Sequence, residues 1–186
     1  MWQFRPEVDI RILAVDSLAN IRNDEFDLAL FYCRTLPSNL IATPLFSESV
    51  FPVCSPAYLA KNPHIANPES LAESTLLSLE VREDWLSWND WFINCDLKPP
   101  SENAKRIKIN NYPLVIQSAL NGQGLALAWA HLVDDYLASD LLVRPVDKAL
   151  TTESQFYMLE PPESPRPKVG VELVRDWLAN QVEGQV

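Results

Sequence analysis

Short apolar runs alternate along this chain with segments of helical spacing, and this alternation restricts the fold more than any other feature. Phe26–Tyr32, Leu76–Leu79 and Leu125–Trp129 are almost continuously apolar, as strands buried on both faces are. Strands that are joined through helices form parallel sheets by right-handed crossover connections. The sequence therefore predicts an α/β protein.

The first half of the chain predicts further strands. Val8–Val15 alternates apolar with polar residues and then becomes wholly apolar, which indicates a strand, and residues 16–23 have the spacing of a short helix. Leu40–Leu45 and Ser49–Cys54 are two more extended runs, and residues 46–48 separate them. We therefore expect a strand, helix, strand unit followed by two strands.

Local signals mark where helices begin and end. Ser55 and Pro56 are an N-cap and a first-turn proline for a short helix, and Asn111 precedes a helix that extends to Leu120. Gly122 follows that helix, where glycine favours a left-handed C-terminal cap. A phosphate-binding loop needs glycines before a helix, so no cofactor is predicted.

Three tryptophans recur every third residue. Trp85, Trp88 and Trp91 would share one stripe of a helix over residues 83–92. One interpretation is an aromatic cage for a cationic ligand, and the other is a helix held against the sheet by bulky side chains. We favour the second, because such stripes more often belong to a core.

Composition excludes several classes of protein. With 15 Lys and Arg against 25 Asp and Glu, the net charge is -10, which opposes binding to DNA by this segment alone. No apolar run is long enough to span a bilayer, and the first residues lack a secretory signal, so we expect a cytoplasmic protein. Three dispersed cysteines and two histidines predict neither a metal site nor disulfides, and no nucleophile motif predicts an enzyme.

Several blocks of sequence occur in the order and spacing of a known family. They are Phe26–Leu30, Leu45–Leu59, Gln117–Leu127, Leu141–Pro145 and Arg175–Leu178. Together they resemble the effector-binding domain of LysR-type transcriptional regulators, most closely the subgroup typified by the glycine-cleavage activator. The resemblance implies two Rossmann-like subdomains joined by a hinge, as in type 2 periplasmic binding proteins. Residues 1–45 with 161–186 would form subdomain I, and residues 46–160 subdomain II.

The resemblance also implies a function and the parts that this chain lacks. The domain would bind a small-molecule effector, such as a carboxylate or an amino acid, and would control transcription through a dimer or tetramer. DNA would be bound only through a helix-turn-helix domain that is absent here, and the first strand of subdomain I is expected to be missing. Exposed sheet edges would then favour low stability or self-association. A solute-binding protein, or an enzyme of that fold acting on a small anion, is the alternative.

Candidate effector-binding residues follow from the rule that ligands of open α/β sheets bind beyond the carboxyl ends of strands. Helix N-termini at such places suit an anion, and an arginine could add a charged hydrogen bond. Helix capping is the alternative role for the Asp and Asn residues, a solvated cation for the arginine, and core packing for the tryptophan. The residues are Asp16, Ser17, Tyr32, Cys33, Arg34, Ser55, Pro56, Asn110, Asn111 and Trp129.

Overall fold

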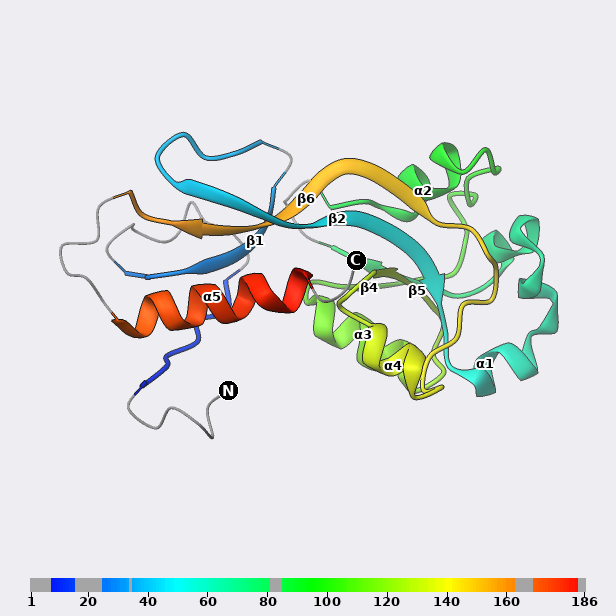
Figure 1. Ribbon diagram of the computed structural model, residues 1–186. Coiled ribbons are helices and arrows are strands. Elements are labelled where there is room, and N and C mark those ends of the chain that lie inside the picture. Colours follow the sequence, from blue (N-terminus) through cyan, green and yellow to red (C-terminus); the bar gives the residue numbers. More distant parts are fainter. Residues whose placement is uncertain (1–7, 16–24, 34, 81–84, 163–168, 184–186) are drawn as a thin grey trace. The chain divides into compact units, whose positions relative to one another are not determined.

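A computed structural model shows a mixed α/β fold (Figure 1). It describes residues 8–15, 25–33, 35–80, 85–162 and 169–183. The chain divides into two compact units: unit 1 is Met1–Ser47 with Glu153–Val186, and unit 2 is Glu48–Thr152. The chain therefore passes between the units twice.

Within the described residues, six strands form one mixed sheet in the order β1-β6-β2-β5-β3-β4. The strands are β1 (Ala29–Cys33), β2 (Ile41–Val53), β3 (Leu76–Leu79), β4 (Arg106–Ile109), β5 (Leu125–Trp129) and β6 (Leu150–Glu160). The helices are α1 (Pro56–Lys61), α2 (Trp88–Asn94), α3 (Tyr112–Leu120), α4 (Asp134–Ala138) and α5 (Val169–Glu183), with two 3-10 helices, η3 (Pro63–Ala66) and η4 (Pro68–Glu73). The predicted strands at β3 and β5 and the predicted helix α3 are confirmed.

Unit 1 contains an antiparallel pair of strands and the C-terminal helix. β1 pairs with β6, with Phe31 opposite Tyr157. Helix α5 is attached to β6 by a forked ion pair, in which Arg175 Nε lies 2.9 Å from Glu160 Oε1. Such bidentate pairs fix orientation as well as charge.

The prediction of a strand over Val8–Val15 is wrong. Val8–Val15 has no strand structure, and the apolar side chains that follow Val8 are exposed, Ile12 by 87%. An alternating pattern makes a strand only where a neighbouring strand takes up its backbone hydrogen bonds, and no described strand pairs with this segment. The helix predicted over residues 16–23 lies outside the described residues.

Unit 2 is a sheet covered on both faces. β3 is parallel to β4 and to β5, and β5 is antiparallel to β2. Helices α2 and α3 lie on opposite faces of this sheet (Figure 1). The face under α3 holds a cluster of buried apolar residues: Phe51, Val53, Leu77, Val115, Ile116, Ala119, Ala126, Ala128, Val133 and Leu142. Parallel strand pairing therefore occurs in unit 2. The parallel strand, helix, strand unit predicted over residues 8–32 is not found, because Val8–Val15 is not a strand and β1 pairs antiparallel with β6.

The two extended runs predicted around residues 46–48 form one strand. β2 continues through Phe46, Ser47 and Glu48 without a break. A polar residue interrupts a strand only if it must reach water, and the Glu48 side chain is fully buried and hydrogen-bonded instead. The prediction of two strands is wrong for this reason.

Two of the three tryptophans hold α2 against the sheet. Trp88 Nε1 donates to the carbonyl oxygen of Leu77 at 2.9 Å, and Trp91 Nε1 donates to that of Val50 at 3.0 Å. Ser87 and Asp90 form a capping box that begins the helix at Trp88. The interpretation of a helix held by bulky side chains therefore fits these two rings, whereas Trp85 precedes the helix and does not share their stripe.

The predicted helix caps are confirmed. Ser55 Oγ accepts from the backbone N–H of Tyr58, and Asn111 Oδ1 accepts from that of Leu114. Gly122 has a φ of 72°, the left-handed conformation expected after α3. At Gly124 a Cβ atom would lie 2.4 Å from the Thr75 carbonyl oxygen, so only glycine permits this approach of β5 to the chain before β3.

Candidate functional site

The three parallel strands of unit 2 end at the same edge of the sheet. Because β3 is parallel to both β4 and β5, the residues that follow them, Glu80, Asn110 and Ala130, lie at one edge. This edge is where ligands of open α/β sheets bind. The strand geometry therefore predicts that side chains at this edge of unit 2 contact a ligand.

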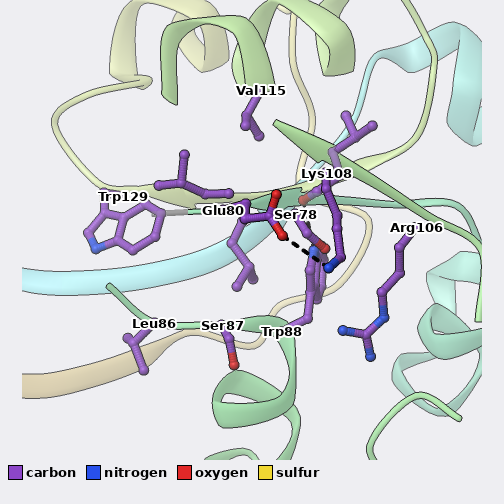
Figure 2. A pocket seen from close by; sticks show the side chains of 12 residues that line it. Ser78, Glu80, Leu86, Ser87, Trp88, Arg106, Lys108, Val115 and Trp129 are labelled. Carbon is purple, nitrogen blue, oxygen red and sulfur yellow. Dashed lines mark hydrogen bonds and ion pairs between the residues drawn. The ribbon is translucent and has the colours of Figure 1, made fainter. Parts of the chain in front are cut away.

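A cavity of about 230 Å³ lies between these strands and the start of α2. In Figure 2, Trp129 and Leu86 lie at one end of it, and Arg106 and Lys108 lie at the other. The lining residues are Leu77, Ser78, Leu79, Glu80, Leu86, Ser87, Trp88, Arg106, Lys108, Val115, Leu127 and Trp129. The cavity thus has an apolar end and a charged end.

Three aromatic rings meet at the apolar end. The ring centroid of Trp129 lies 4.8 Å from that of Trp85 in an edge-on arrangement and 5.4 Å from that of Tyr112. The Tyr112 hydroxyl accepts the backbone N–H of Trp129 at 3.2 Å. Burial raises the pKa of Tyr112 far above its ordinary value, although this backbone hydrogen bond opposes the shift, so the hydroxyl stays protonated.

A buried carboxyl group fixes the Trp129 indole. Glu48 on β2 is 0% exposed. Its Oε1 accepts from Trp129 Nε1 at 2.7 Å, and its Oε2 accepts from the Thr152 hydroxyl on β6. A buried acidic group is tolerated only when its oxygens are hydrogen-bonded. Glu48 therefore ties two strands to the ring that lines the cavity.

The charged end consists of long side chains from β4. Lys108 Nζ lies 3.0 Å from Glu80 Oε1, and both side chains are more than half exposed, so this ion pair adds little stability. Arg106 donates to the amide oxygen of Asn89 at 3.0 Å. Among the described residues, Arg106 has no carboxylate within ion-pair distance.

Several residues predicted for the site take other positions or roles. Asn111 caps α3, and Asn110 is exposed directly after β4. Ser55 and Pro56 line a second cavity, of about 410 Å³, beside Gly122.

Tyr32 is buried in unit 1 against Phe156. Cys33 ends β1, and Asp16, Ser17 and Arg34 lie outside the described residues.

The cavity also contains residues that the sequence did not single out. Arg106, Lys108 and Ser78 belong to strands that look ordinary in sequence, and Glu48 interrupts an apolar run. The interruption at Glu48 was the only signal in the sequence, since an acidic residue inside a buried strand needs hydrogen-bond donors near it. Of the predicted residues, Trp129 is the one that lines the first cavity.

Buried thiols give a direct test of this packing. Burial raises the pKa of the Cys54 thiol to about 11, and burial is also the largest cause of the raised pKa of Cys95. The thiolate is the form that alkylating reagents attack. At about pH 8 we therefore expect iodoacetamide to leave Cys54 unmodified in the folded protein and to modify it in denaturant, as measured by peptide mass spectrometry. Equal modification in both conditions would contradict the buried position.

Neither membrane nor metal features occur in the part of the chain that the structure describes. None of its helices is long and apolar enough to cross a membrane. Within the same residues, no group of three or more His, Cys, Asp and Glu side chains is placed to hold a metal ion.

Two solved structures share the fold of this chain. The effector domain of the transcriptional regulator AmpR of Pseudomonas aeruginosa matches with a TM-score of 0.78 and 22% identity over 99% of this chain and 85% of that chain. The regulatory domain of CrgA, a LysR-type regulator from Neisseria meningitidis, matches with a TM-score of 0.76 and 20% identity over 97% of this chain and 87% of that chain. The fold is that of effector-binding domains, which resemble periplasmic binding proteins.

The model of the LysR substrate binding domain family matches residues 3–183, and this chain belongs to that family. The glycine cleavage system transcriptional activator of Escherichia coli K12 is 32% identical over 158 residues, which are 83% of this chain and 49% of that protein. The HTH-type transcriptional regulator PerR of the same strain is 27% identical over 95% of this chain and 58% of that protein. The chain spans about half the length of these relatives. The resemblance stated from sequence blocks is confirmed.

Proposed function

We propose that this chain is the sensor of a transcriptional regulator: a small effector binds to it, and the bound state changes how the whole protein acts on its promoters. The observation that carries this proposal is the family match from residue 3 to residue 183. The relatives that match are transcriptional regulators, which favours this function over a solute-binding protein or an enzyme.

Such a sensor gives its signal by binding the effector and not by catalysing a reaction. A ligand that prefers one conformation of the domain increases the population of that conformation, and this shift is the signal. The cavity that Trp129 lines is the described feature that best fits an effector site, because it combines apolar and charged walls and reaches the carboxyl ends of β3 and β5. The other effector-binding residues predicted from the sequence, and the two subdomains of residues 1–45 with 161–186 and 46–160, stay predictions.

The whole regulator would act through partners. We expect it to bind DNA through a helix-turn-helix domain outside this segment and to act as a homodimer or tetramer in the cytoplasm. The net charge of -10 supports this separation of effector binding from DNA binding, because a domain of this charge repels polyanions.

Thermal unfolding with a panel of small carboxylates, amino acids, amines and neutral metabolites tests the proposal. A compound that binds only the folded state, at about 100 times its Kd, stabilises the protein by about 2.7 kcal/mol. For a domain of this size that shift corresponds to roughly 5–10 °C. We expect at least one compound to raise the melting temperature and to be recovered unchanged.

Two results would contradict this function. If no compound shifts the melting of a cooperatively folded protein, the domain is not a sensor of these metabolites. If the stabilising compound is recovered as a product, the protein is an enzyme and the alternative is correct.

A further inference from the structure

The cavity beside α2 has a positive charge that no described carboxylate balances. Lys108 and Glu80 neutralise each other, whereas Arg106 contacts only the neutral amide of Asn89. The described residues that line the cavity therefore sum to about one unit of net positive charge, from Arg106 and Lys108 against Glu80, although the chain as a whole carries -10. A cation of this kind on the wall of a cavity favours an anion.

A serine hydroxyl beside these cations lacks a partner. Ser78 lines the cavity, and it is paired with Lys108 across β3 and β4, so both side chains lie on the same face of the sheet. Within the described residues, Ser78 Oγ is buried and has no hydrogen-bond partner. A buried polar group of this kind is unfavourable unless something bonds to it. An oxygen from a ligand would satisfy it.

The opposite end of the cavity is suited to an apolar group. Trp129, Leu86 and Leu127 line it, and all three are buried. The Trp129 ring donates to Glu48 and packs edge-on against Tyr112, so it presents a fixed surface. The volume of about 230 Å³ is below the range of pockets that enclose drug-sized ligands, which indicates a metabolite-sized molecule.

We propose that this cavity binds a small carboxylate with an apolar or aromatic body. The carboxylate lies between Arg106 and Lys108 and accepts from the Ser78 hydroxyl, and the body lies against Trp129 and Leu86 (Figure 2). This inference rests on the proposed sensor function and names the chemical class of the effector. Arginine is the residue best suited to recognise a carboxylate by two parallel hydrogen bonds.

The experiment uses three matched probes. They are 3-phenylpropionate, which has both groups, 3-phenylpropanol, which lacks the charge, and propionate, which lacks the ring. Titration followed by calorimetry is expected to show binding of 3-phenylpropionate at least about tenfold tighter than binding of either other probe, since each lacks one of the two interactions.

Variants then place the binding in this cavity. Arg106→Gln is expected to weaken 3-phenylpropionate binding about tenfold or more, because a charged hydrogen bond is lost. Lys105→Gln is the matched control, since Lys105 is exposed, lies next to β4 and does not line the cavity. Ser78→Ala removes the unpartnered hydroxyl, so it is expected to weaken binding while leaving the melting temperature equal to or above that of the unchanged protein.

The outcomes separate this inference from the function on which it rests. Equal binding of 3-phenylpropanol, no binding of any probe, or the same affinity in Arg106→Gln and Lys105→Gln would overturn the carboxylate assignment. If an amine or a neutral metabolite stabilises the protein at the same time, the sensor function stands with another class of effector. If no compound of the wider panel stabilises it, both proposals are wrong.

Discussion

Trp91→Ala is expected to lower the free energy of unfolding by about 3–5 kcal/mol, the usual cost of removing a fully buried large aromatic side chain. Trp91 on α2 has no solvent exposure, packs edge-on against Phe92 and donates to the carbonyl oxygen of Val50 on β2. Alanine leaves a cavity between α2 and β2 and removes that hydrogen bond. The change corresponds to a drop in melting temperature of roughly 10 °C, measured by circular dichroism.

Two further variants separate packing from other effects. Trp91→Phe keeps a ring and loses the N–H donor, so it is expected to cost clearly less. Ile93→Ala changes a side chain that is 59% exposed on the same helix, so its effect is expected to stay below about 1 kcal/mol. Equal losses from Trp91→Ala and Ile93→Ala would show that α2 is not held by Trp91.

Glu48→Ala is expected to cost about 2–4 kcal/mol, because a buried donor and a partly buried donor lose their acceptor at once. The Trp129 indole N–H loses its hydrogen bond to Glu48, and the Thr152 hydroxyl loses one of its contacts. Without this support the indole no longer has a fixed orientation at the cavity. We therefore expect a second effect, a shift of the Trp129 indole resonance in the ¹H–¹⁵N spectrum, with that resonance assigned from Trp129→Phe.

Glu48→Gln and Glu153→Ala are the controls. Glutamine keeps the shape and an oxygen that accepts from the indole, so it should restore most of the stability and of the spectrum. Glu153 is exposed on β6, near Thr152, and its loss should change neither. If the Trp129 resonance of Glu48→Ala stays at its original position, Glu48 does not orient the ring, whatever its effect on stability.

Local structure was predictable wherever its cause lies within a few residues. Ser55, Asn111 and Gly122 cap helices because their side chains or backbone conformations act on the adjacent turn. The apolar runs of β3 and β5 were predictable because strands buried on both faces need apolar residues on both. The family resemblance rested on such blocks and their spacing.

Predictions failed where distant residues decide the structure. Val8–Val15 has the pattern of a strand, but no described strand pairs with it. Residues 46–48 suggested a break in β2, which disappears because Trp129 and Thr152 supply donors to Glu48. Trp85 has the right spacing for the tryptophan stripe, yet it packs on Tyr112 and Trp129 before the helix begins.

The candidate site shows the same contrast between features that neighbouring residues decide and features that distant residues decide. The sequence by itself determined the α/β class, the caps and the family, because periodicity, capping and the spacing of sequence blocks can be read along the chain. Only the tertiary structure decided that Arg106 and Ser78 share a cavity with Trp129, and that Glu48 holds the indole from 81 residues away. Hydrogen bonds between strands depend on register and burial, which no local pattern of residues encodes.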